Sequence, residues 1–156
     1  MGVPLLSTAE QGLNPTPPMR TQGETEMPMS NNLQTADWKA EKHVPAIECP
    51  DAVAPGEMFE VKVALGKAAE HPNTTEHHIG WIRVFFRPDG DKFTYDVGYF
   101  AFNAHGASVA GANKGPVYTH YSAAFMMKVD RPGTIHAVAE CNIHGLWESE
   151  RRLALK

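Results

Sequence analysis

Cysteine is scarce in this sequence, whose 156 residues contain two, Cys49 and Cys141. A chain with so few cysteines is not a small disulfide-stabilised domain. Long apolar runs are also missing: no stretch approaches the roughly 20 residues that span a bilayer, so we do not expect an integral membrane protein. Positive charge is in deficit, with 14 Lys and Arg against 18 Asp and Glu and a net charge of −4. A broad cationic face for nucleic acid is therefore not expected.

The length fits one domain, since domains average roughly 150 residues. Residues 1–30 are rich in Pro, Gly, Ser, Thr, Gln and Asn without sustained apolar periodicity, which predicts an extension, and the working domain is assigned to residues 31–156. The start of the chain lacks the cationic residues and the apolar run of roughly 7 to 15 residues of a secretory signal, because Val3, Leu5 and Leu6 are followed at once by polar residues. We therefore expect a cytoplasmic protein.

Short β-type runs separated by Gly, Pro, Asn and Asp follow the extension, and helical patterns are hard to find. Apolar residues occupy every second position of residues 59–65, as in a strand with one buried face. Residues 87–91 read Arg-Pro-Asp-Gly-Asp, a turn sequence that joins two strands into a hairpin. The expected strands are residues 43–48, 58–65, 79–86, 93–102, 117–129, 134–140 and 146–155. Seven short strands predict an all-β fold, an immunoglobulin-like antiparallel β-sandwich.

Histidine, by contrast, is abundant, with eight residues. Imidazole is the side chain that most often binds metals or transfers protons near neutral pH. His71 and His77 bracket a short loop that opens with a Pro-Asn turn, and two imidazoles so placed can converge on one ion. We expect His77 to begin the next strand; because alternate strand residues face opposite ways, His77 and His78 cannot easily serve one site. An ordinary surface or core role for these histidines is the alternative.

Cys141 and His144 stand three residues apart at the end of an expected strand, and Gly145 follows them. A thiolate and an imidazole at this spacing form a compact chelating pair, and glycine permits a tight backbone there. A buried, inert cysteine beside a loop histidine is the alternative. Cys49 has no histidine within three residues and is expected to be inert. Three separated segments that offer soft or imidazole ligands together predict a metal site.

The donor set alone does not choose the metal, since one thiolate with several imidazoles suits Fe(II), Cu or Zn. A structural zinc site is usually closed by four ligands, typically with more cysteine. A blue-copper site uses two His, one Cys and a weak axial Met. The residues after His144 read Gly-Leu-Trp-Glu-Ser-Glu and contain no Met. Copper is therefore disfavoured.

Four motifs in this sequence resemble, in order, those of the one-iron superoxide reductases, the neelaredoxin group related to desulfoferrodoxin. The motifs are Glu-Lys-His-Val-Pro at 41–45, His-Pro-Asn-Thr-Thr-Glu-His-His-Ile at 71–79, Ala-His-Gly at 104–106 and Cys-Asn-Ile-His-Gly-Leu-Trp-Glu at 141–148. The resemblance extends from about Leu33 to residue 156. It implies a seven-stranded immunoglobulin-like sandwich that binds one Fe(II)/Fe(III) ion per chain through four equatorial His and one axial Cys.

The resemblance also implies a role for individual residues. The implied equatorial ligands are His43, His71, His77 and His144, and the axial ligand is Cys141. Glu41 matches a carboxylate that takes the sixth position of the ferric ion, and Lys42 matches a cation near the open face; ordinary surface charges are the alternative for both. His78 matches the non-ligand neighbour of His77. The other histidines that match no ligand, and that we expect to be structural or surface residues, are His105, His120 and His136. Residues 1–40 contain no cysteine for a second, rubredoxin-like iron centre, so none is expected.

The implied reaction is one-electron reduction of superoxide to hydrogen peroxide, with an external donor such as rubredoxin returning the iron to Fe(II). A protein of net charge −4 repels an anion at long range, so a local cation is needed, and Lys42 fits that task. The alternatives are a non-catalytic electron-transfer or structural metal domain and an enzyme that also oxidises superoxide to dioxygen. The one-iron members are often tetramers, so a homotetramer is implied as well.

Overall fold

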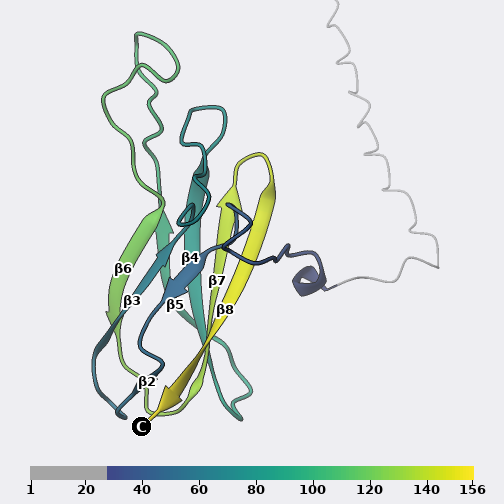
Figure 1. Ribbon diagram of the computed structural model, residues 1–156, viewed down its shortest axis with the longest axis vertical. Helices are drawn as coiled ribbons and strands as arrows, with labels where there is room; N and C mark the ends of the chain where they lie inside the picture. Colours follow the sequence, from purple (N-terminus) through teal and green to yellow (C-terminus); the bar gives the residue numbers. More distant parts are fainter. Residues whose placement is uncertain (1–27) are drawn as a thin grey trace, which may run out of the picture.

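The structure is a computed structural model that describes residues 28–156. Over these residues the chain forms one short 3-10 helix and eight strands, arranged as two packed sheets (Figure 1). The elements in chain order are η1 (Met29–Asn31), β1 (Ala46–Glu48), β2 (Ala52–Val53), β3 (Phe59–Ala64), β4 (Ile79–Pro88), β5 (Tyr95–Ala101), β6 (Ser122–Met127), β7 (Gly133–Cys141) and β8 (Gly145–Leu155). Most of the predicted N-terminal extension, up to residue 27, lies outside the described residues. Within residues 28–156, no helix is long and apolar enough to cross a membrane.

The smaller sheet has the strand order β1-β3-β6, and the larger has the order β2-β8-β7-β4-β5. All neighbours are antiparallel except β2 and β8. The predicted all-β sandwich is confirmed, and each of the seven expected runs overlaps one strand. The additional strand, β2, has only two residues, which is too short for periodicity to reveal. The predicted hairpin joins β4 to β5: Gly90 has a φ of 70°, and the Asp91 N–H donates to the Pro88 carbonyl at 3.2 Å.

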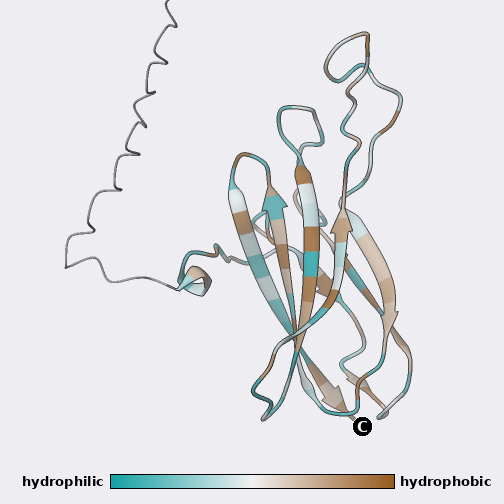
Figure 2. Cartoon of the chain, turned by 180° about the vertical axis from the view of Figure 1, so that it is seen from behind, coloured by the Kyte–Doolittle hydropathy of each residue, from teal (hydrophilic) through white to brown (hydrophobic). Residues whose placement is uncertain are grey.

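The core lies between the sheets and follows from residue alternation along the strands (Figure 2). In β7, every second residue is buried and those between are half-buried. The buried members of this row are Gly133, Ile135, Ala137, Ala139 and Cys141. Burial of the Ile135 side chain alone stabilises the fold by about 1.5–3 kcal/mol, and a shift of one residue would turn the whole row toward solvent, so the row fixes which face of β7 points inward. Cys141 is its last member, and its thiol therefore enters the end of the core.

Three connections meet at one end of the sandwich, the upper end in Figure 1: residues 65–78, 102–121 and 142–144. Strand register places them there, because Ile79 pairs with Cys141 and Trp81 pairs with the last residue of β5. The segment before β1 reaches the same region, since Gln34 forms a bridge with Trp147 of β8. The motifs singled out in the sequence are therefore brought together by topology.

Candidate metal centre

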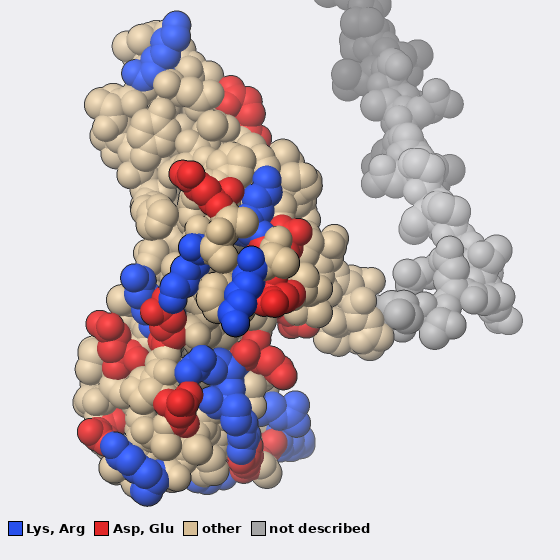
Figure 3. Space-filling view, viewed as in Figure 1, with Lys and Arg blue, Asp and Glu red and all other residues tan. Residues whose placement is uncertain are grey.

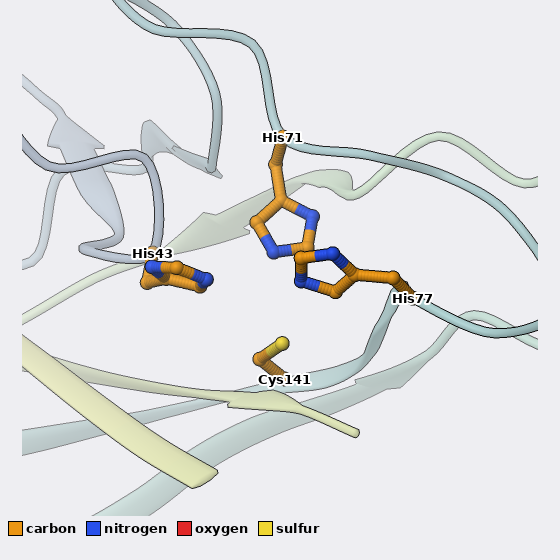
Figure 4. Close-up of side chains that lie close together, drawn as sticks. All are labelled: His43, His71, His77 and Cys141. Atoms are coloured by element: carbon orange, nitrogen blue, oxygen red, sulfur yellow. The ribbon is translucent and has the colours of Figure 1, made fainter. Parts of the chain in front are cut away.

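Four side chains point toward one another at this end of the sandwich (Figure 4): His43, His71, His77 and Cys141. Their potential ligand atoms all lie within 4.8 Å of one another. His43 precedes β1, His71 and His77 come from the 65–78 connection, and Cys141 ends β7. Three of the four residues are buried, and His77 is half-buried. A group of donors this compact and this well shielded can enclose a single ion.

The Nε2 atoms of His43, His71 and His77 are buried and have no hydrogen-bond partner. A buried polar atom without a hydrogen-bond partner lowers the stability of the folded state by about 1–3 kcal/mol. Three such atoms beside one another therefore need a common explanation. The opposite nitrogens of two rings are engaged: His43 Nδ1 lies 2.6 Å from Glu41 Oε1, and His71 Nδ1 lies 2.7 Å from the Pro72 carbonyl oxygen. An Nδ1–H that donates in this way leaves the lone pair on Nε2, as in metal-bound histidines. The residues present therefore fit a metal ion.

His144, the remaining predicted ligand, lies beside this group. Its Nδ1 is 3.5 Å from Cys141 Sγ, and its ring centroid is 4.6 Å from that of His43 and 4.9 Å from that of His77. His144 is exposed and stands outside the set of atoms that lie within 4.8 Å of one another. The nitrogen that faces the sulfur, Nδ1, is the one that can join the set. All five predicted ligand residues are thus neighbours, and their binding to iron stays a prediction.

Burial favours the neutral form of these imidazoles. It lowers the pKa of His71 to about 4, and the neighbouring His43 and His77 push in the same direction. Burial also lowers the pKa of His43, against the opposing effect of the Glu41 carboxylate, and it lowers the pKa of His77. A metal binds the neutral imidazole, so the folded chain presents these rings near neutral pH without first having to remove protons.

Glu41 is bonded to His43 in this structure. Its Oε1 accepts hydrogen bonds from the His43 ring at 2.6 Å and from the His43 backbone N–H at 3.1 Å. Burial alone would raise the pKa of Glu41, but these two bonds outweigh it and hold the pKa below its usual value. Sequence reasoning missed this orienting contact, although the spacing of a carboxylate two residues before a histidine was visible. The predicted place of Glu41 as a sixth ligand stays a prediction.

Lys42 lines an open pocket of about 400 Å³ beside the site. Glu70 and His71 share that pocket, together with Pro72 and Asn73. The charge of Lys42 is among the causes that lower the pKa of His71, so it acts on one of the predicted ligands. This position is compatible with the predicted task of Lys42, which is to offer a local positive charge to an anion.

The prediction that His77 begins a strand is wrong. β4 starts at Ile79, and His77 belongs to a small turn in which the Thr74 N–H donates to the His77 carbonyl and the His77 N–H donates to Thr74 Oγ1, each at 3.0 Å. Strand alternation therefore does not separate His77 from His78. Instead, the His78 ring stacks on His105, with centroids 3.7 Å apart and planes 10° apart. His77 lies in the group of four, and His78 lies outside it.

The fold and the site together define a metal-binding β-sandwich. The family model described as desulfoferrodoxin matches residues 35–150. The neelaredoxin of Megalodesulfovibrio gigas is 59% identical over 130 residues, which cover 83% of this chain and 100% of that protein. The superoxide reductase of Pyrococcus furiosus is 49% identical over 122 residues, covering 78% of this chain and 96% of the relative.

A solved structure shows the same architecture. The superoxide reductase (neelaredoxin) of Archaeoglobus fulgidus in the reduced form has a TM-score of 0.74 at 54% identity, covering 79% of this chain and 98% of that one. The chain therefore belongs to the desulfoferrodoxin family. Its relatives within that family are neelaredoxins and superoxide reductases, so the family predicted from the four motifs is confirmed.

Proposed function

We propose that this chain is a superoxide reductase, an oxidoreductase that reduces superoxide with one electron and two protons to hydrogen peroxide. The observation that carries the proposal is the convergence of three unpartnered histidine Nε2 atoms on the Cys141 thiol, in a chain of this family. Relatives at 59% and 49% identity are a neelaredoxin and a superoxide reductase, in agreement with the activity predicted from the sequence. The cofactor is one iron ion per chain.

The residues that would hold the iron are His43, His71, His77, His144 and Cys141. The first three would bind through Nε2 and His144 through Nδ1, because these are the atoms that face the site. Bound iron supplies the electron for superoxide and accepts one from a donor. Cys141 is only 1% exposed, so its sulfur is shielded from the oxidants that attack accessible thiolates.

Lys42 and Glu41 act around the ion in this proposal. The Lys42 ammonium attracts superoxide into the open pocket beside His71, and it can hand a proton to the departing product directly or through water. Glu41 holds the His43 ring in place. The same carboxylate would leave His43 to bind the ferric ion as its sixth ligand, the role that the family resemblance implies.

The remaining elements of the proposal concern the chain's surroundings. A separate donor must restore the reduced state, and we propose a rubredoxin-like protein for that step, on the basis of the family resemblance. A cytoplasmic location and a working domain of residues 31–156 are proposed from the sequence, and a homotetramer is proposed from the family resemblance alone. The family match to residues 35–150 lies within the proposed domain.

Replacement of Cys141 by Ser tests the function. The purified wild-type chain should hold about one iron, and Cys141→Ser should lose the thiolate-to-iron absorption of the oxidised protein together with nearly all superoxide reduction. Anaerobic iron reconstitution followed by pulse-generated superoxide and absorbance detection measures both. Cys49→Ser is the matched control, because Cys49 is half-buried and lies outside the group of ligand atoms, and it should retain both properties.

Each alternative leaves a distinct signature in this experiment. Unchanged absorption in Cys141→Ser would remove the thiolate from the iron site. Stoichiometric zinc or copper in place of iron would favour a structural or electron-transfer domain and contradict the proposed function. Oxygen evolved together with peroxide would reveal dismutation, because a reductase forms peroxide alone.

A further inference from the structure

The connection that supplies two predicted ligands has no regular secondary structure between His71 and His78. Its internal order comes from a small turn in which three hydrogen bonds join Thr74 to His77, and from a contact of 2.9 Å between His78 Nδ1 and the Thr74 carbonyl oxygen. Such a turn fixes its own shape but not its place relative to the site. Contacts from other parts of the chain must therefore decide where the His71 and His77 rings point.

His105 supplies such contacts to both halves of this loop. It comes from the 102–121 connection, is 8% exposed, and lies outside the metal-binding group. Its Nδ1 lies 2.7 Å from Asn73 Oδ1, two residues after His71, and its ring stacks on His78, one residue after His77. One imidazole thus touches the loop next to each of its two predicted ligands.

The other side of His105 is anchored to the sandwich. Its Nε2 lies 2.7 Å from the carbonyl oxygen of Phe102, a buried core residue whose N–H donates to Gly80 at 2.8 Å. The next residue, Gly106, has a φ of 80°, and a Cβ there would lie 2.3 Å from the Tyr118 hydroxyl oxygen. Glycine is therefore needed for the chain to turn away directly after the imidazole. The Ala-His-Gly motif builds a fixed support beneath the loop.

Asn73 extends this support. Its side-chain amide nitrogen donates to the Thr119 carbonyl at 3.1 Å, which orients its Oδ1 toward His105. Thr119 is tied in turn to Ala104, through a backbone bond of 2.7 Å and a side-chain bond of 3.3 Å. The loop is thus bonded to a frame that contains none of the predicted ligands.

We propose that His105 is a positioning residue for the metal centre, which fixes the 71–78 loop so that His71 and His77 face a single point before the metal arrives. This inference rests on the proposed function, since it takes both histidines as ligands. Loss of a residue that supports metal ligands from outside typically lowers metal affinity by roughly 10-fold to 100-fold. Because His105 acts through Asn73 and His78 and not on a ligand ring, we expect about 10-fold.

His105→Phe tests the inference, because it keeps an aromatic ring to stack on His78 and removes the two ring nitrogens that lie 2.7 Å from Asn73 Oδ1 and from the Phe102 carbonyl oxygen. Co(II) titration of the metal-free protein against a competing chelator should show about 10-fold weaker binding. Amide hydrogen exchange in the metal-free protein should become faster in residues 73–78, which a purely global loss of stability would not confine to this loop. His136→Phe is the matched control: His136 lies on β7, within 3.7 Å of Glu150, and its replacement should change neither measurement.

His105→Gln covers the case in which the Phe variant fails to fold. Glutamine can still donate to one of the two oxygens, so its Co(II) affinity should lie between those of the wild type and His105→Phe. Wild-type Co(II) affinity and wild-type exchange in either His105 variant would overturn the inference, as would equal weakening in His136→Phe. A wild-type protein that fails to bind Co(II) would overturn the metal centre itself, and the inference with it.

Discussion

At the scale of single residues, Glu41 is bonded to His43 and is also proposed as the sixth ligand of the ferric ion, and these two tasks can be separated by substitution. Glu41→Gln keeps an oxygen that can accept from His43, whereas Glu41→Ala removes the acceptor. We therefore expect Glu41→Ala to lower the Co(II) affinity of the metal-free protein by about 10-fold and Glu41→Gln to lower it less. Both variants should alter the visible spectrum of the oxidised iron protein, because both lose the carboxylate that is proposed as the sixth ligand.

Chelator competition and absorption spectroscopy measure the two effects separately. Equal Co(II) affinities for Glu41→Gln and Glu41→Ala would show that the hydrogen bond to His43 does not hold the ring. A wild-type spectrum in both iron-loaded variants would remove Glu41 from the sixth position. The first outcome would leave Glu41 with the ligand role alone, and the second would leave it with the orienting role alone.

The candidate site was predictable from sequence to different degrees at different residues. Cys141 and His144 stand three apart, and His71 and His77 bracket one loop, so local spacing marks them. His43 has no such neighbour, and only the resemblance of its motif marked it. The support from His105 to Asn73 escaped prediction because the two residues are 32 positions apart and meet only when two irregular connections pack together.

At the scale of elements, Asn142 ties the turn between β7 and β8 to the 65–78 connection. Its Oδ1 accepts from the His78 N–H at 2.8 Å, and its side-chain nitrogen donates to the Glu76 carbonyl at 2.9 Å. Asn142→Ala removes both bonds and keeps the backbone bond from Asn142 N to the His78 carbonyl. Because the bonds are exposed, we expect the free energy of unfolding of the metal-free protein to fall by about 1 kcal/mol.

Urea unfolding of the metal-free protein measures this change. Asn32→Ala is the control, since Asn32 is exposed and its bond to Met29 uses the backbone alone. Asn142→Asp retains the acceptor for His78 and loses the donor to Glu76, so it should be intermediate. If Asn142→Ala is as stable as Asn32→Ala, the two ligand-bearing connections are not coupled through this side chain.

The strands were predictable where one face is buried, because alternation with a period of two is then imposed by the core. The boundaries of the connections between strands were not predictable in this way. Residues 117–121 read as the beginning of a strand, yet β6 begins at Ser122. Tyr121 instead donates its hydroxyl to the His71 carbonyl, and its own carbonyl accepts from Leu65 at 3.1 Å. Tyrosine is common in strands, but the Tyr121 side chain supports the 71–78 loop instead. Strand propensity alone cannot distinguish these two roles.

At the scale of the whole molecule, charge is mixed and no sign dominates the face seen in Figure 3, where Lys and Arg alternate with Asp and Glu. With a net charge of −4, long-range attraction of superoxide must come from a local group. Lys42→Ala should therefore slow the reaction with superoxide by about 10-fold at low ionic strength while iron stays bound. It should also flatten the salt dependence, because exposed charges are screened over roughly 10 Å at 0.1 M salt.

Pulse-generated superoxide at several salt concentrations measures both effects, with iron content determined on the same samples. Lys92→Ala removes the same charge from the hairpin between β4 and β5, at the end of the sandwich opposite the metal centre, and should leave rate and salt dependence unchanged. Lys42→Arg keeps the charge and should restore most of the rate. A Lys42→Ala variant with the wild-type rate and salt slope would show that superoxide reaches the centre without help from this ammonium group.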